Sequence, residues 1–159
     1  MKQRYTITAI AENKPGVLYR IADLLLRRKI NIESLTVSEI EHKGMSRFTI
    51  VIDAERNLVE KVGKQLYRII EMTKVIESTD DELVPREIAL IKVTAKSKDA
   101  REEIEQLVRL SKGRIIHVDK GYLVAEITGN ETEIDKLDEL LQPFGIKEIV
   151  RSGRIAVFK

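Results

Sequence analysis

The sequence predicts an α+β protein built from two ferredoxin-like βαββαβ domains, each with two helices covering one face of an antiparallel sheet. Strand-like and helix-like hydrophobic periods follow one another in this order up to residue 78, and the same order returns after residue 86. An acidic, proline-containing stretch separates the two halves. We therefore expect domains at residues 1–78 and 87–159, joined by a linker at residues 79–86.

The first half alternates between two hydrophobic periods. Phe48, Ile50 and Ile52 recur at every second position, which is typical of a strand with one buried face. Val17 and Ile21 are four residues apart, as on one face of a helix. The expected elements are strand 4–11, helix 17–29, strands 32–40 and 46–54, helix 58–70 and strand 73–78.

The second half repeats this architecture without repeating the sequence. Ile104, Leu107 and Val108 mark the apolar face of one helix, and Ile134 and Leu137 that of another. The expected elements are strand 87–95, helix 100–110, strands 114–118 and 122–128, helix 131–144 and strand 147–150. A sheet covered on one side only leaves a face and an edge free, which favours a homo-oligomer.

Composition limits the classes of function. The 159 residues are 43% hydrophobic and 34% charged, a globular balance without a membrane segment or signal peptide, and we expect a cytoplasmic protein. Cysteine is absent, which excludes disulfides, thiolate catalysis and cysteine-ligated zinc. The 28 basic and 26 acidic side chains are interleaved, so neither a nucleic acid nor a membrane is an expected partner.

No catalytic or metal site is predicted. His42 lies in a charged hairpin sequence and His117 in a strand, and neither has a nucleophile or metal-ligand cluster near it in sequence. Ser34, Ser38 and Ser46 lack an elbow motif or triad order.

Two enzymatic or binding uses of this fold are disfavoured by the sequence. An RNA-recognition module stacks bases on aromatic side chains of the central strands, and only seven residues here are Phe or Tyr. A small phosphatase of acylphosphatase type needs a phosphate-gripping loop and arginine, which Lys14 to Gly16 followed by Arg20 matches poorly. Arg27, Arg28 and Lys29 are interpreted as charges that offset a helix dipole.

The junction at residues 12–18 carries the strongest functional signal. The first amides of a helix have no intrahelical acceptor and stabilise a carboxylate or phosphate. Gly16 permits close approach to the backbone, and the side-chain oxygen of Asn13 can accept a hydrogen bond from an ammonium group. These residues therefore suit both ends of an amino acid, although Asn, Pro and Gly also favour an ordinary helix cap and turn.

The chain resembles the ACT domain, an amino-acid-sensing module of metabolic enzymes. The residues that carry the resemblance are 12–18 (ENKPGVL) and 27–37 (RRKINIESLTV). More narrowly, residues 46–50, 86–93 and 151–153 are similar to the small regulatory subunit of acetolactate (acetohydroxyacid) synthase. The resemblance implies that the N-terminal domain is an ACT domain.

The resemblance also implies a non-catalytic regulatory subunit that forms a homodimer. It would join a large thiamine-diphosphate-dependent catalytic subunit, raise its activity and confer inhibition by a branched-chain amino acid, usually valine. Thiamine diphosphate, Mg and FAD are expected on that partner, with no cofactor on this chain. The alternative is a free-standing ACT-domain sensor that regulates a different enzyme or a transcription factor.

The same resemblance assigns the ligand-binding residues. Asn13, Gly16 and Val17 match the ligand loop, and Asn31 and Ile32 match a segment that completes the site at the interface between two ACT domains. Leu18 and Leu35 are further candidates for its apolar lining. Valine and leucine differ by one methylene, worth about 0.8 kcal/mol on burial, so several branched-chain amino acids should bind.

Overall fold

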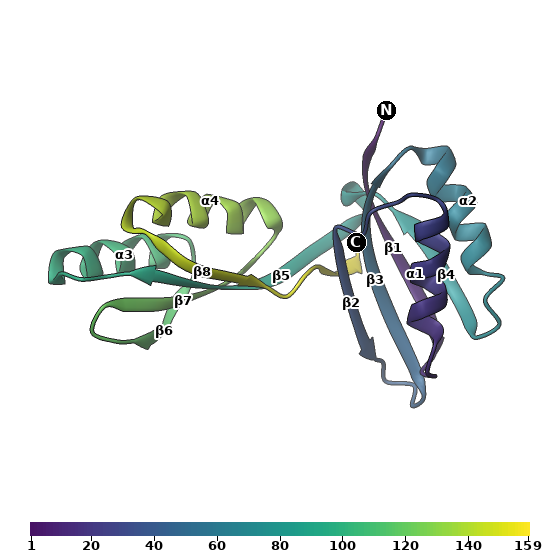
Figure 1. The fold of residues 1–159 in the computed structure, drawn as a ribbon, viewed down its shortest axis with the longest axis horizontal. Helices are drawn as coiled ribbons and strands as arrows, with labels where there is room; N and C mark the ends of the chain where they lie inside the picture. Colours follow the sequence, from purple (N-terminus) through teal and green to yellow (C-terminus); the bar gives the residue numbers. More distant parts are fainter. The chain divides into compact units, whose positions relative to one another are not determined.

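The first sheet of the computed structural model, which describes residues 1–159, has the strand order β2-β3-β1-β4, and all its neighbours are antiparallel. The two helices cover one of its faces (Figure 1). The element order βαββαβ confirms the predicted fold class. The elements are β1 (Gln3–Glu12), α1 (Val17–Arg27), β2 (Ser34–Glu39), β3 (Met45–Ala54), α2 (Arg56–Leu66) and β4 (Met72–Ser78).

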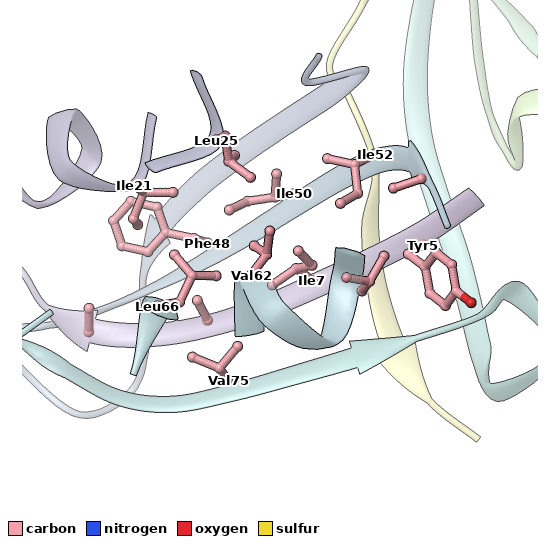
Figure 2. Close-up of a cluster of buried hydrophobic side chains, with 14 of the residues drawn as sticks. Tyr5, Ile7, Ile21, Leu25, Phe48, Ile50, Ile52, Val62, Leu66 and Val75 are labelled. Carbon is pink, nitrogen blue, oxygen red and sulfur yellow. The ribbon is translucent and has the colours of Figure 1, made fainter. Parts of the chain in front are cut away.

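The core of this unit lies between the sheet and the helices. Alternate side chains of β1 and β3, such as Ile7 and Ile50, point toward Ile21 of α1 and Val62 of α2 (Figure 2), and all four are fully buried. The alternation arises because successive side chains of a strand point to opposite faces of the sheet. The hydrophobic periods read from the sequence therefore select the faces that are buried.

The second unit repeats the arrangement, with strand order β6-β7-β5-β8. Its elements are β5 (Leu83–Thr94), α3 (Lys98–Leu110), β6 (Arg114–Val118), β7 (Tyr122–Gly129), α4 (Glu131–Leu141), the 3-10 turn η2 (Gln142–Phe144) and β8 (Ile146–Arg151). Ile104 and Ile134 of its helices pack on alternate residues of β5 and β7. A last strand, β9 (Ile155–Phe158), pairs with β5.

The domain boundaries differ from the prediction. The two compact units are Met1–Val84 with Arg154–Lys159, and Pro85–Gly153. Residues 79–86, predicted as a linker, are structured instead: the 3-10 helix η1 (Asp80–Glu82) has a capping box between Thr79 and Glu82, and β5 begins at Leu83.

Three of the four helices, α1, α2 and α4, end earlier than predicted, whereas α3 ends at Leu110 as expected. Helix α1 ends at Arg27 because the chain turns at Lys29, which has a left-handed φ of 55°. Helix α2 begins at Arg56 and ends at Leu66, four residues before the expected Ile70. The end of α4 tightens into η2, whose Pro143 cannot continue an α-helical ladder.

Residues 154–159 belong to the first unit, although they were predicted in the second domain. The side chain of Arg154 is 1% exposed, donates to Thr6 Oγ1 at 2.9 Å and forms an ion pair with Asp80. Its backbone bonds Ser34 Oγ and Thr36 Oγ1, both at 2.9 Å. Thr6, Ser34 and Thr36 alternate with core residues along β1 and β2, so they lie on the sheet face opposite the helices.

The chain therefore partly covers the face of the first sheet that the sequence was expected to leave free. Arg47, on this face of β3, also donates to the carbonyl of Ala156 at 2.8 Å. Within β9, Ala156 is buried, whereas Ile155 and Val157 are exposed. No helix of the chain is long and apolar enough to cross a bilayer.

Candidate functional site

The loop between β1 and α1 is held by its backbone. The amide of Asn13 donates to the carbonyl of Gly44 in the β2–β3 turn at 2.8 Å, and the amide of Lys14 donates to Glu12 at 2.9 Å. Gly16 then takes a left-handed conformation, φ 88° and ψ −10°, as the residue that precedes α1. A side chain is disfavoured at this φ, so glycine gives the loop its shape as well as its accessible backbone.

The first turn of α1 is open. No side chain caps it, whereas the Ser97 and Asn130 side chains cap α3 and α4. The amides of Leu18 and Tyr19 lie in this turn, where they have no intrahelical acceptor. The helix-cap interpretation of Asn13 is wrong, because Gly16 occupies the cap position and α1 has no side-chain cap.

Charged side chains flank this open turn. Lys14 forms an ion pair with Glu12, and this hydrogen bond raises the pKa of Lys14. Arg20 contacts Glu71 with 2.5 Å between Nη1 and Oε2, and this hydrogen bond lowers the pKa of the Glu71 carboxyl. The other terminal nitrogen of Arg20 lies 3.8 Å from where a Cβ on Gly16 would be.

Arg20 is therefore a functional candidate that the sequence analysis did not assign to the site. Its signal was its spacing: Arg20 is four residues after Gly16, one helical turn along, and its amide donates to the Gly16 carbonyl at 3.1 Å. A cation in the first turn opposes the helix dipole, and the buried carboxylate of Glu71 offsets that cost.

Three of the predicted ligand-binding residues lie at or just before the first turn of α1, and they differ in what they can offer a ligand. Asn13 is exposed, with its side chain free to face a ligand. Val17 is only 1% exposed and its side chain belongs to the core, so only its backbone is available to a ligand. Leu18 is 44% exposed and can offer an apolar surface.

The other predicted residues lie at the far end of the helix. Asn31 and Ile32 follow α1, and its 11 residues correspond to a length of about 16 Å. The Asn31 side chain donates to Glu33 at 3.0 Å, while Ile32 and Leu35 are partly buried against the core. A single chain does not bring these residues together with Asn13 and Gly16.

The two groups of predicted residues, Asn13 with Gly16 and Asn31 with Ile32, also differ in their position along the first sheet. Asn13 is bonded to Gly44, just beyond the end of β2, whereas Asn31 and Ile32 precede the first residue of β2. Strand β2 is an edge strand, paired with β3 on one side only. The two halves of the predicted site thus lie at opposite ends of one free edge.

Neither histidine side chain makes a hydrogen bond or ion pair with a residue of this site. His42 is exposed in the β2–β3 turn, and His117 is exposed on β6 with its ring 5.8 Å from that of Tyr122. No three His, Cys, Asp or Glu side chains are grouped as metal ligands.

The fold and the open helix end define the class of protein. Residues 7–74 match the family model of the AHAS small subunit-like ACT domain, and residues 86–159 match that of the small subunit of acetolactate synthase. The first unit is therefore an ACT domain within a two-domain protein of ferredoxin-like units.

Whole-chain comparisons agree with both family models. The chain is 42% identical to a probable acetolactate synthase small subunit of Archaeoglobus fulgidus, over 98% of this chain and 97% of that one. It is 41% identical to the acetolactate synthase small subunit of Aquifex aeolicus, over 98% and 81% of the two chains. The crystal structure of the small subunit from Thermotoga maritima matches with a TM-score of 0.89 at 34% identity, covering 99% of this chain and 98% of that one.

The chain belongs to the acetolactate synthase small-subunit family, and it is a regulatory subunit with an ACT domain as its first unit.

Proposed function

We propose that this protein activates the large catalytic subunit of acetolactate synthase and makes it sensitive to a branched-chain amino acid, with valine as the first candidate. The observation that carries the ligand proposal is the uncapped first turn of α1 behind the left-handed Gly16. Family membership supports the assembly with a large subunit in branched-chain amino-acid biosynthesis.

The chemistry of an amino acid fits this turn. A carboxylate would accept hydrogen bonds from the amides of Leu18 and Tyr19, with the Arg20 guanidinium nearby. The side-chain oxygen of Asn13 would accept from the ammonium group. An aliphatic side chain would need apolar walls, which the exposed part of Leu18 and residues of a second copy would supply.

A two-fold dimer would complete the site. If β2 of one copy pairs antiparallel with β2 of another, the start of one strand lies beside the end of the other. Asn31 and Ile32 of the second copy would then approach Asn13 and Gly44 of the first. The placement of the two residue groups at opposite ends of the β2 edge supports this arrangement.

We propose that the isolated chain has no catalytic activity, and that thiamine diphosphate, Mg and FAD are bound by the large subunit. Regulation then requires the amino acid to bind one state of the assembly more tightly than another, because equal affinity would shift no equilibrium. Binding across two copies of the ACT domain provides such a difference, since it favours one arrangement of the dimer.

The test is a calorimetric titration of the chain with valine, leucine and isoleucine, with lysine and a nucleotide as negative controls. We expect saturable binding of the branched-chain ligands, lost in Asn13→Ala and Gly16→Asp and retained in the matched control Asn57→Ala on α2. The variants should still activate the large subunit in a reconstituted assay but abolish inhibition by valine. Full valine inhibition of Asn13→Ala would reject the site.

A further inference from the structure

A second concave site lies between the two helices of the first unit. It is a groove of about 560 Å³, and its only apolar side chain is Leu24. The groove is lined by Arg20, Asp23, Leu24, Arg27 and Arg28 of the α1 segment and by Gln65 and Arg68 of the α2 segment. Four guanidinium groups thus share one groove with a single carboxylate, Asp23.

Two of the four arginines are held in place by acids. Arg27 forms an ion pair with Asp23 one turn earlier in α1, with 2.9 Å between Nε and Oδ2. Arg20 is fixed by Glu71, which is itself buried. In both pairs at least one terminal nitrogen of the arginine remains available, because the contact with the acid uses only part of the five-donor guanidinium group.

The other two arginines have donors to spare. Arg28 donates through Nε to the Gln65 side chain at 3.2 Å, which orients its terminal nitrogens. The side chain of Arg68 makes no hydrogen bond or ion pair within the chain, and only its backbone amide is bonded, to the Gln65 carbonyl at 3.0 Å. A helix dipole explains cations near the C-terminal ends of α1 and α2, but it does not explain Arg20 in the first turn of α1.

The lining selects a class of ligand. Guanidinium groups bind phosphate and carboxylate oxygens through two parallel hydrogen bonds, and several of them around one groove match several anionic groups. The lining contains no aromatic ring on which a base could stack. We propose that this groove binds a small multivalent anion that carries two or more phosphate or carboxylate groups.

This site is distinct from the amino-acid site but adjoins it through Arg20. That arginine lines the groove and also lies beside Gly16. A ligand that draws the Arg20 guanidinium into the groove changes the charge next to the open turn of α1, so the two ligands should alter each other's affinity by the same factor.

The test uses calorimetric titration of the full chain with two probes, pyrophosphate and citrate, at several salt concentrations. We expect saturable binding of at least one probe, weaker as salt increases. The double variant Arg28→Ala/Arg68→Ala removes the two arginines outside ion pairs and should weaken binding at least tenfold. The matched control Arg109→Ala/Lys136→Ala removes the same charge from α3 and α4 and should bind normally.

Each result is decisive. Binding of pyrophosphate alone identifies phosphate groups as the ligand chemistry, and binding of citrate alone identifies carboxylates. Absence of saturable binding, or an equal loss in the control, overturns the proposal. The proposal is also overturned if the variant Arg28→Ala/Arg68→Ala binds the anions as tightly as the parent but no longer associates with the large subunit. The groove would then be a contact for an acidic protein surface. The same variant should bind valine normally. A failure of the anion-groove proposal can therefore be distinguished from a failure of the amino-acid site.

Discussion

Gly16 illustrates how one backbone angle shapes the candidate site. Its φ is 88°, and a Cβ there would meet nothing closer than an ordinary contact with Arg20. Gly16→Ala therefore adds backbone strain without a clash, and we expect it to lower the free energy of unfolding by about 1–2 kcal/mol. Equilibrium urea unfolding measures this change.

The control for this prediction is Gly121→Ala. Gly121 also has open space around a new Cβ, but its φ is outside the left-handed region. Its substitution should leave stability within about 0.5 kcal/mol of the parent or raise it slightly. Equal losses at both glycines would show that the Gly16 conformation carries no particular strain.

The pair of Arg20 and Glu71 predicts a pH dependence. The hydrogen bond from Arg20 lowers the pKa of Glu71 in the folded state. The ionised carboxylate therefore contributes stability that is fully present above its unfolded pKa of about 4.3 and is lost as pH falls through the lowered folded value. Measured from pH 7 to pH 2.5, the difference in unfolding free energy between the parent and Glu71→Gln should shrink below about pH 4.

Glu105→Gln is the comparison variant, because Glu105 is exposed on α3 and forms no ion pair in the structure. Its stability should follow the parent curve throughout the acidic range. A parent-minus-Glu71→Gln difference that stays constant down to pH 2.5 would contradict the proposed contribution of the pair.

Single residues also show the limits of sequence reasoning at the site. Asn13 and Gly16 were recognisable because a polar residue and a glycine stand directly before an amphipathic period. Arg20 was not assigned, because its partner Glu71 is 51 residues away and only the fold brings the two side chains together. Val17 matches a family position, yet its side chain faces the core, as its place in the apolar stripe of α1 already indicated.

At the scale of elements, hydrophobic periods were sufficient to predict both βαββαβ units. The helix ends were predicted less well, because periodicity continues beyond the point where Lys29 turns the chain and where residues 67–70 form turns. The position of β9 could not be predicted, since it pairs with β5, a strand that begins far earlier in the sequence at Leu83, and the hydrophobic pattern of four residues does not identify a pairing partner.

The segment with β9 yields the element-scale prediction. Arg154→Ala removes a buried side chain together with its bonds to Thr6 and Asp80. Asp80 is half exposed and can be solvated after the change, so we expect a loss of about 2–4 kcal/mol, mostly from packing and hydrogen bonds. Hydrogen exchange should show reduced protection in β1 and β2, and urea unfolding should give the magnitude.

Val157→Ala provides the control on the same strand. Val157 points outward and is 61% exposed, so its truncation should change stability by less than about 0.5 kcal/mol. If Arg154→Ala were as mild as Val157→Ala, the tail would not stabilise the first unit.

At the scale of the whole molecule, the proposed dimer can be tested at the free edge of β2. Val37 is 44% exposed on that strand, and Val37→Lys would place like charges close together across a two-fold axis. We expect sedimentation to shift toward the monomer and valine binding to weaken at least tenfold, because each site of the proposed dimer uses residues of two copies.

The matched change is Val118→Lys, which places a lysine on β6, the edge strand of the second sheet, at a residue that is 55% exposed. This variant should keep both the dimer and valine binding. A Val37→Lys protein that remains dimeric and binds valine normally would exclude the β2 edge as the interface.

The return of residues 154–159 to the first unit makes that unit discontinuous in sequence, with Pro85–Gly153 inserted between its parts. Domains commonly fold in order of synthesis, N-terminal first, as the chain leaves the ribosome. Here the second unit is translated in full before Arg154 is synthesised. Until then the first sheet lacks the contacts that Arg154 makes with Thr6 and Asp80. The first unit, whose folding begins earliest, is therefore completed only after the whole of the second unit has been made.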